Sequence, residues 1–415
     1  MRDTETGGRI VVVGAGPVGL AVAALLAHGP AATRLRLRVV DSQPPPVWNL
    51  AAIDSRVYAL SRGAQRIFAQ LGQWDTMCAR RVSPYERMRV WQGDRHEGPA
   101  AIDFDCADIG EPDLGHIVED ALIRDALLSA LAGHVELSFG AAVAGVAQVA
   151  DGMRITLDSG ETLGADLLVA ADGGASRVRS LLAMPVLERS YAQHAIVTHV
   201  TTAAPHAHTA WQRFLPTGPL AFLPLTDGRS SVVWSMPSDR ARALLACNDA
   251  EFLLALQTAA GSVLGTLGPS AARAAFPLTK LHAVEYCRRG VALVGDAAHC
   301  VHPLAGQGMN LGLLDAACLA EELARAALGG EHVGDARVLQ RYARLRKLEN
   351  LGMLLACDAL ERLFRLPLWS VPLRGLGLAA VDRAMPIKRA LMRRALGLRA
   401  GRAGEQYAPI RGLMP

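Results

Sequence analysis

Near its start the chain carries a pattern that few folds accommodate. A short β-branched run, Arg9-Ile-Val-Val-Val13, is followed at once by Gly14-Ala-Gly-Pro-Val-Gly19. The apolar stretch from Leu20 to Ala27 then suits a helix packed on a sheet, and residues 35–40 predict a second strand that ends at Asp41. Together these segments predict a βαβ unit with its glycines at the first turn.

The Gly-x-Gly-x-x-Gly spacing between a strand and a helix is the fingerprint of dinucleotide binding. Its glycines permit a tight turn, a close backbone approach to a pyrophosphate, and close packing of helix on strand. The start of the helix offers free N–H groups and a partial positive charge. Asp41 can accept hydrogen bonds from ribose hydroxyls and would repel a 2′-phosphate, which indicates FAD or NAD rather than NADP. The alternative is a glycine-rich turn without a ligand. The predicted contacts in this loop are Gly14, Ala15, Gly16, Pro17, Val18 and Gly19.

Two further loops follow predicted buried strands. Residues 165–171 lead into Asp172-Gly-Gly174, and residues 291–294 lead into GDAAHCVHPLAGQGMN at 295–310. The loop at 295–310, the third glycine-containing loop of the chain, holds more glycine than a turn requires. We therefore expect its backbone to lie very close to a ligand. A metal site at His299 and His302 is a competing explanation. It lacks a completing carboxylate or Cys cluster and leaves the glycines unexplained, so we predict no metal.

These three motifs, in this order from Ile10 to Asp315, resemble those of the flavin-dependent aromatic hydroxylases of the single-component, class A type. Within that group, HPLAGQGMNLGLLD (302–315), RFLPTGPLAFLPL (213–225) and SRVYALS (55–61) are similar to the bacterial ubiquinone-biosynthesis hydroxylases. One segment departs from the pattern. Asp120, Ala121 and Arg124 stand where relatives often carry Glu-Asn-Arg and a later Gln.

The resemblance implies FAD as cofactor and hydroxylation of the ring of a polyprenylated phenol in ubiquinone biosynthesis, through a flavin C4a-hydroperoxide formed with O₂. The reductant would be NAD(P)H, or a reductase or ferredoxin partner. A separate NAD(P)H-binding Rossmann domain is not expected, because the chain has one dinucleotide fingerprint.

The resemblance also implies an α/β fold of the para-hydroxybenzoate-hydroxylase type. This fold is a Rossmann-like FAD domain with an inserted antiparallel substrate sheet and C-terminal helices. Strand-like stretches broken by Pro and Gly within 191–235 agree with the inserted sheet. The predicted division is a FAD domain at 1–75, 100–185 and 280–330, a substrate domain at 76–99 and 186–279, and a helical region at 331–415.

Each motif supplies candidate site residues. The remaining predicted cofactor contacts are Arg56, Arg124, Asp172, Gly295, Asp296, Gly306, Gln307, Gly308, Met309 and Asn310. We expect Asp296 to accept hydrogen bonds from the ribityl chain. Residues 306–310 are expected to precede a helix that begins near Leu311, with their backbone facing the pyrimidine end of the flavin. Pro303 and Gly306 are predicted to form the backbone environment of catalysis, with no side-chain acid or base, and His299 is predicted to be structural. Candidate substrate contacts, with ordinary core as the alternative, are Trp211, Arg213, Phe222 and Pro224.

The charge of the chain is unevenly distributed. Residues 337–415 contain 16 Lys or Arg and five Asp or Glu, although the net charge of the whole chain is +4. Such a segment predicts contact with an anionic membrane or an acidic partner in a biosynthetic complex, and a solvated helical face is the alternative. No nucleic-acid partner is predicted. Seven scattered Cys and the lack of an apolar run of ~18–20 residues predict a cytoplasmic protein, with peripheral attachment to the inner membrane as one option.

Three other functions stay open at this point. The first is hydroxylation of a small soluble aromatic compound, for which Arg213 would hold a carboxylate. The second is a flavin-dependent reductase of prenyl chains. The third is a flavoprotein without catalytic activity.

Overall fold

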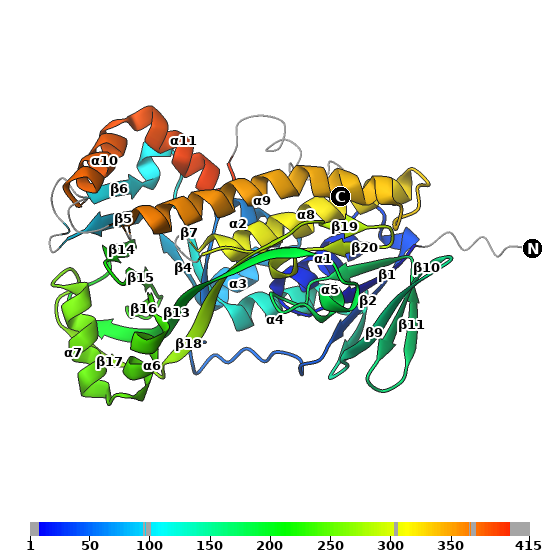
Figure 1. Ribbon diagram of the computed structural model, residues 1–415, viewed down its shortest axis with the longest axis horizontal. Helices are drawn as coiled ribbons and strands as arrows, with labels where there is room; N and C mark the ends of the chain where they lie inside the picture. Colours follow the sequence, from blue (N-terminus) through cyan, green and yellow to red (C-terminus); the bar gives the residue numbers. More distant parts are fainter. Residues whose placement is uncertain are drawn as a thin grey trace, which may run out of the picture.

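Two large β-sheets lie along the longest axis of the molecule, and helix α9 (Ala336–Phe364) runs past both of them (Figure 1). The computed structural model describes residues 8–93, 96, 101–302, 306–364, 366 and 371–398.

The first sheet has six strands in the order β19-β20-β12-β1-β2-β8. All neighbours are parallel except β19, which is antiparallel to β20. Its strands are β1 (Gly8–Val13), β2 (Leu35–Asp41), β8 (Glu136–Phe139), β12 (Leu167–Ala170), β19 (Cys287–Arg288) and β20 (Val291–Leu293). The β-branched and leucine-rich runs in β1, β12 and β20 are buried, as expected for strands covered on both faces.

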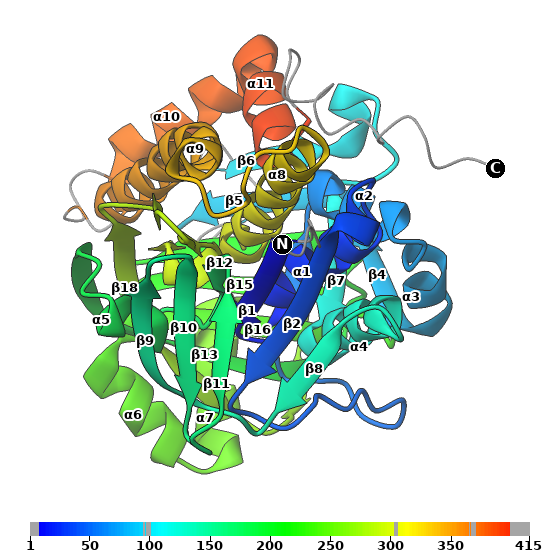
Figure 2. The ribbon, with the colours of Figure 1, turned by 90° about the vertical axis from the view of Figure 1, so that its right-hand side faces the viewer.

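Helices and a small antiparallel sheet enclose this parallel sheet. Helix α1 packs against α4 and α8, while the small sheet contacts β1 and β12. Figure 2 shows the small sheet beside the parallel strands. The elements are α1 (Pro17–Ala27), α4 (Asp120–Leu131), α8 (Gln307–Leu328), β9 (Val143–Val149), β10 (Gly152–Leu157) and β11 (Thr162–Ala165).

The second large sheet is mostly antiparallel and has the order β21-β18-β13-β16-β15-β14-β5-β6, with β17 paired to β13. Helices α6 (Ser238–Ala246) and α7 (Asp249–Ala260) cover one of its faces and share an apolar core with it. Its strands are β5 (Arg87–Gln92), β6 (Ala101–Asp105), β13 (Val186–Thr202), β14 (Thr209–Leu215), β15 (Gly218–Pro224), β16 (Ser230–Pro237), β17 (Leu267–Ser270), β18 (Ala274–Ala283) and β21 (His299–Cys300).

A three-stranded sheet in the order β3-β7-β4 and several short helices complete the part of the chain before the C-terminal helices. These elements are β3 (Val57–Leu60), β4 (Val82–Tyr85), β7 (Gly115–Glu119), α2 (Arg62–Gln70), α3 (Trp74–Arg81), α5 (Arg177–Leu181), and the 3₁₀ helices Ala32–Arg34, Cys106–Ile109 and Gly295–Ala297.

The C-terminal region is helical, with α10 (Val371–Arg383) and α11 (Met385–Ala395) following α9. Pro372 and Pro386 each occupy the second residue of a helix, where the missing N–H costs little. The ring of Phe364 stacks on Phe214 of β14 at 3.6 Å between centroids, which joins the end of α9 to the second sheet. None of the described helices has both the length and the apolar character needed to cross a bilayer.

The α/β class, the inserted antiparallel sheet and the C-terminal helices confirm the predicted fold. Helix α8 begins at Gln307 rather than near Leu311, so residues 307–310 form its first turn. Strands β6 and β21 pair within the second sheet although they fall in ranges assigned to the FAD domain. The division into domains otherwise stays a prediction.

Candidate active site

Three loops meet at one edge of the parallel sheet. Strands β20, β12, β1 and β2 are neighbours with a common direction, so their carboxyl ends lie together. The chain proceeds outward from β1 in both directions, to β2 and β8 on one side and to β12 and β20 on the other. Ligands of open α/β sheets bind in the crevice at such a switch point. The loops that begin at Gly14, Ala171 and Val294 border this crevice.

The Gly14–Gly19 loop has the geometry that its spacing predicts. Gly14 has φ +107°, and a Cβ there would lie 2.4 Å from the carbonyl oxygen of Ala171. A Cβ on Gly19 would lie 2.0 Å from the oxygen of Gly14, so helix and strand approach closely here. A Cβ on Gly16 would meet nothing within 4 Å. Since the first turn of α1 carries no acid and its N–H groups lack helical acceptors, the space over Gly16 suits a phosphate.

Asp41 and Arg124 both contact Ala15 in this loop. The Asp41 carboxylate accepts the Ala15 N–H at 2.5 Å, and the Arg124 Nε donates to the Ala15 carbonyl at 3.2 Å. Arg124 also pairs with Asp120 at 3.7 Å. The departure from the family pattern therefore still places a guanidinium at the edge of the nucleotide loop.

Val18 joins the first loop to the third. A Cβ on Gly295, which has φ +57°, would lie 3.1 Å from the Val18 side chain, and one on Gly312 would lie 2.6 Å from it. Val18 therefore packs between two glycines, one at the start of the third loop and one in α8. This gives Val18 a packing role and brings the start of α1 close to α8.

Asp296 lies in the short 3₁₀ helix that follows β20. Its side chain is exposed, yet the surrounding protein raises the pKa of its carboxyl through burial, against the opposing charges of His299 and Arg56. The Arg56 guanidinium itself lies over the ring of Phe276 at 5.3 Å. A carboxylate that is largely enclosed but still reachable is well placed to accept hydrogen bonds from hydroxyl groups of a ligand.

The start of α8 provides a second helix terminus at the crevice. Gly306 is its N-cap, with φ +60°, and the first turn carries no acid. A Cβ on Gly308 would have the Val301 side chain at 3.8 Å as its nearest neighbour. The Asn310 amide bonds to the N–H of Ser61 at 2.8 Å, so this side chain holds α8 to the segment before α2. Pro303 lies outside the described residues.

Asp172 and Arg179 brace the middle loop. The Asp172 carboxylate accepts the Ser176 hydroxyl at 2.6 Å and the Val178 N–H at 3.0 Å, which fixes the start of α5. The buried Arg179 guanidinium donates to the Ala297 carbonyl at 2.9 Å and so links the second motif to the third. The sequence assigned no role to Arg179. Its signal was an Arg within a short segment of small residues.

A buried ionic cluster lies behind the third loop. The Asp315 carboxylate contacts His299 Nε2 at 2.5 Å and accepts hydrogen bonds from Arg346 Nε at 2.7 Å and Asn350 at 3.0 Å. It also accepts the Gly295 N–H at 3.2 Å. His299 is therefore held deep in the core, as a structural residue would be. Sequence reasoning missed Asp315 as a central residue, although a lone acid in the apolar segment LGLLD was a usable signal.

The four predicted substrate residues lie on the sheet face that turns away from these loops. Phe222 and Trp211 pack into the core shared with α6 and α7, and Arg213 donates to the Ala259 carbonyl of α7 at 2.8 Å. Pro224 follows Phe222 by two strand positions and so shares its face. The substrate proposal therefore moves to the other face. Local sequence gives the alternation along a strand but not which face meets the cofactor.

The opposite face turns toward the glycine-rich loops. Gln193 lies 3.3 Å from His302 Nε2, and His199 Nε2 lies 2.9 Å from the Asp54 carbonyl. Four half-buried apolar side chains share this face on the adjacent strands β13, β15 and β16, namely Val197, Ala221, Leu223 and Val233. These small and branched side chains can receive a flat apolar ring, and we name them the ring face.

The donor set of this crevice fits FAD. The first turns of α1 and α8 carry no acid, and the approach at Gly16 is open, which suits phosphate groups. The exposed carboxylate of Asp296 suits the hydroxyl groups of a polyol. Among the described residues, no group of three His, Cys, Asp or Glu side chains is placed to hold a metal ion.

Sequence comparisons agree with this geometry. The profile of the FAD binding domain family matches residues 8–350. The 3-demethoxyubiquinol 3-hydroxylase of Escherichia coli (strain K12) is 37% identical over 393 residues, which cover 94% of this chain and 98% of that protein. The mitochondrial ubiquinone biosynthesis monooxygenase COQ6 of Xenopus tropicalis is 35% identical over 434 residues, with 92% of each chain covered. The ubiquinone hydroxylase UbiL of Rhodospirillum rubrum is 37% identical over 391 residues, covering 94% of this chain and 89% of its own.

Solved structures share the fold at lower identity. The p-nitrophenol 4-monooxygenase PnpA of Pseudomonas putida DLL-E4 has a TM-score of 0.74 at 19% identity, covering 95% of this chain and 99% of its own. PqsL of Pseudomonas aeruginosa has a TM-score of 0.72 at 24% identity, covering 90% of this chain and 99% of its own. From the family profile, the relatives and the loops at the sheet edge, the chain belongs to the FAD-dependent monooxygenases, in the family of the ubiquinone-biosynthesis hydroxylases.

Proposed function

We propose that this protein hydroxylates the aromatic ring of a polyprenylated phenol in ubiquinone biosynthesis. The relatives named for ubiquinone hydroxylation cover nearly the whole chain, which supports the substrate class. The observation that carries the proposal is the ring face, Val197, Ala221, Leu223 and Val233, on the side of the sheet where Gln193 contacts His302 of the third loop.

Each loop has a task in this reaction. The start of α1 over Gly16 binds the pyrophosphate, Asp41 binds the ribose, and Asp296 binds the ribityl chain. The N–H groups of residues 307–309 at the start of α8 stabilise negative charge at the pyrimidine end of the flavin. Bound in these loops and reduced, FAD would supply the activation of O₂, one atom of which would enter the ring. The apolar ring face holds the phenol and excludes water, and no side-chain acid or base is assigned.

The electrons come from NAD(P)H, directly or through a reductase or ferredoxin partner. One oxygen atom of O₂ enters the ring and the other leaves as water, so each turnover consumes two electrons. Anaerobic mixing with NADH, NADPH or reduced ferredoxin identifies the donor, because the true donor bleaches the visible flavin absorbance in the presence of a phenol.

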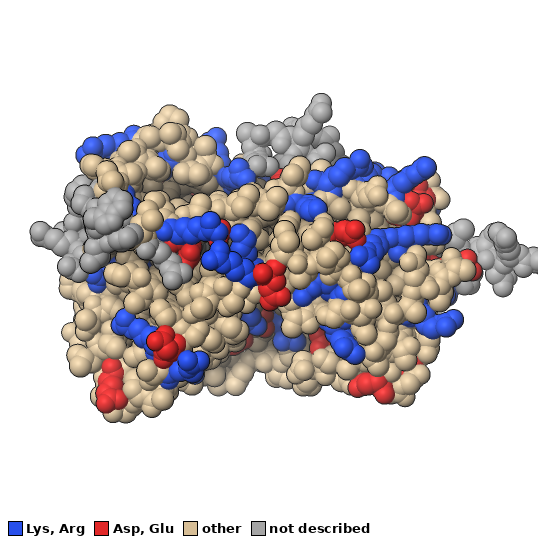
Figure 3. Space-filling model, viewed as in Figure 1, with Lys and Arg blue, Asp and Glu red and all other residues tan. Residues whose placement is uncertain are grey.

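The C-terminal helices provide the contact with the compartment of the substrate. A polyprenylated phenol resides in a bilayer, so a cytoplasmic enzyme must meet the inner membrane or a carrier complex. Lys and Arg side chains occur along the band that α9 occupies (Figure 3). We propose peripheral attachment of the basic C-terminal region to anionic lipid.

The alternative substrate, a small soluble aromatic acid, would need Arg213 to bind its carboxylate. The guanidinium of Arg213 is buried against α7, on the face away from the loops. No other observation on the described residues favours that substrate over a prenylated one.

The proposal is tested with purified protein, FAD, a reductant, a short-chain polyprenyl phenol and ¹⁸O₂. We expect one ¹⁸O atom in the ring of the product by mass spectrometry. Formation of hydrogen peroxide alone with every phenol tried would contradict ring hydroxylation. A product with a saturated prenyl chain would instead establish a reductase.

A further inference from the structure

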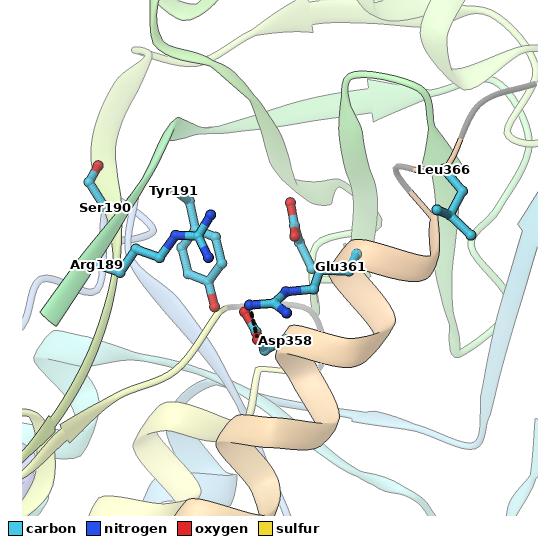
Figure 4. A pocket seen from close by; sticks show the side chains of 7 residues that line it. Arg189, Ser190, Tyr191, Asp358, Glu361 and Leu366 are labelled. Atoms are coloured by element: carbon cyan, nitrogen blue, oxygen red, sulfur yellow. Dashed lines mark ion pairs between the residues drawn. The ribbon is translucent and has the colours of Figure 1, made fainter. Parts of the chain in front are cut away.

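A hollow of about 280 Å³ lies between α9 and the start of β13, the strand that further along carries Val197 of the ring face (Figure 4). Figure 4 shows Arg189, Ser190 and Tyr191 on one side and α9 side chains on the other. Its lining is Arg189, Ser190, Tyr191, Asp358, Glu361, Arg362 and Leu366. None of these residues takes part in the cofactor loops.

A β-bulge directs Tyr191 into this hollow. The register of β13 against β18 shifts between Ser190 and Gln193, and Ala192 has φ +53°, which is unusual for a residue other than glycine. Bulges re-aim side chains and are common beside active sites. The Tyr191 ring meets the His302 ring edge-on at 5.0 Å between centroids, and His302 also contacts Gln193 of β13. Tyr191 therefore stands between the hollow and the loop that leads to α8.

A second hollow of about 550 Å³ continues from the first along the outer side of α9. The two share Asp358, Arg362 and Leu366. The second is otherwise lined by Leu355, Ala359 and Leu363. The three leucines of this lining, Leu355, Leu363 and Leu366, are 42–52% exposed. They leave apolar surface uncovered along a continuous depression.

The charges at the junction decide which kind of ligand fits. Asp358 pairs with Lys280 at 3.3 Å and with Arg362 at 3.0 Å. The lining contains two arginines and two acids, so it exerts no net attraction on a phosphate or a dinucleotide. Arg362 is 62% exposed and can move aside. The leucines of the second hollow favour the binding of an aliphatic chain, because its burial there removes apolar area from water.

We infer that the two hollows form one trough, lined by Tyr191, Leu355, Ala359, Leu363 and Leu366, that holds the polyprenyl tail of the substrate while its ring lies on the ring face. This inference rests on the proposed function. The Leu363 end of the trough adjoins α10, where Arg374 donates to the Leu363 carbonyl at 3.2 Å and where Leu373 and Leu376 are exposed by 63% and 66%. A tail leaving the trough there meets the surface that we expect to contact lipid.

The test uses a ladder of phenols with zero, one, two and three isoprene units. In the wild-type protein kcat/KM should rise along the ladder. Leu363→Asp places a charge in the trough, and we expect the ratio of kcat/KM for the longest tail to that for the tail-less phenol to fall by about tenfold or more. The matched control is Leu345→Asp, at similar exposure (46% against 42%). It lies five turns earlier on the same side of α9, about 27 Å away, and should keep the ratio.

A second measurement does not depend on turnover. A phenol with a three-isoprene tail that ends in a diazirine is bound and irradiated, and the labelled peptide is identified. Label within residues 355–366 supports the trough, and its loss in Leu363→Asp strengthens that assignment. Label elsewhere, no label, or an unchanged ladder in Leu363→Asp while rings are still hydroxylated overturns the trough and leaves the proposed function standing. Failure to hydroxylate any member of the ladder overturns the proposed function itself.

Discussion

Gly16 is the residue on which the proposed binding of FAD depends most directly. It caps the start of α1 in an extended conformation with φ −71°, which other residues can also adopt. The space beside it, where a Cβ would meet no protein atom within 4 Å, is therefore the reason for a glycine. A side chain at this position would be tolerated by the fold but would occupy the place of the pyrophosphate.

We predict that Gly16→Val yields folded protein without FAD. The valine obstructs the approach of the phosphates and leaves the packing of α1 on β1 intact. The check is the visible flavin absorbance after gel filtration, together with the circular dichroism of the same sample. Gly377→Val is the control, because a Cβ there also meets nothing within 4 Å but lies in α10. Normal flavin content in Gly16→Val would show that the loop does not bind the pyrophosphate.

We expect Asp296 to contribute to the same proposed site through its charge. Removing a charged hydrogen-bond partner costs roughly 1–3 kcal/mol, so Asp296→Ala should weaken FAD binding about fivefold to 150-fold. Asp296→Asn keeps one acceptor oxygen, so its affinity for FAD should lie between the affinities of the wild-type protein and Asp296→Ala. Fluorescence titration of apoprotein with FAD gives the dissociation constants. Equal affinity in all three proteins would remove Asp296 from the site.

Several elements converge on Asp315. It lies in α8, and its carboxylate contacts Gly295 and His299 of the third loop and Arg346 and Asn350 of α9. Burial raises the pKa of its carboxyl, but the charges of His299 and Arg346 outweigh this and hold the pKa at about 2, below the ordinary 3.8. The ionised carboxylate therefore stabilises the fold above pH 3.8, and this stabilisation is lost as the pH falls through about 2.

We predict that Asp315→Asn lowers the free energy of unfolding by about 3–5 kcal/mol at neutral pH, because it leaves buried positive charge uncompensated. Urea denaturation measures this. Asp249→Asn is the control, since Asp249 is 78% exposed in its pair with Arg273 and should contribute about 0–1 kcal/mol. Equal losses in both variants would contradict a structural role for the cluster.

The pH dependence of the same variant separates two effects. Burial lowers the pKa of His282 to about 4, so this side chain destabilises the fold as the pH falls from 6.5 to 4. The loss of stability between pH 6.5 and 4 should therefore be the same in Asp315→Asn as in the wild-type protein. The further loss between pH 3.8 and 2 should be smaller in the variant than in the wild-type protein.

At the scale of the whole molecule, the cofactor crevice and the C-terminal helices connect through α9. This helix contacts Asp315 through Arg346 near its middle and lines the trough near its end. Exposed Arg389, Arg393 and Arg394 of α11 and exposed leucines of α10 then form the outermost part of this region. A membrane that contacts this surface would lie at the open end of the trough.

We predict that the protein co-sediments with anionic vesicles more than with neutral ones. Each basic residue near an anionic surface contributes about 1 kcal/mol, so replacing Arg389, Arg393 and Arg394 together by Ser should weaken binding by about two orders of magnitude. Replacing the exposed Arg66, Arg154 and Arg242 together removes the same charge elsewhere and should have little effect. Binding that is indifferent to lipid charge would favour a protein partner instead.

The sequence alone allowed the nucleotide loop and the fold class to be predicted. A β-branched run, three glycines at fixed spacing and Asp41 form one local unit, and local order determines how these residues meet a phosphate. The same holds for Gly295 and Asp296, which follow a short buried strand. The start of α8 was placed four residues late, because Gln307 to Asn310 could not be told from loop without the contacts of Asn310.

Tertiary structure decided which face of the inserted sheet is covered by α6 and α7 and which is left for the candidate cofactor loops. Strand alternation is visible in sequence, but a sheet can present either face, and only the packing of α6 and α7 on Phe222 and Trp211 settles the choice. It also decided that Asp315 contacts Arg346, 31 residues away, and that the β13 bulge lies against α9. Local sequence thus determined the loops that we propose to bind the nucleotide, whereas the proposed substrate surface depends on long-range contacts that no local pattern encodes.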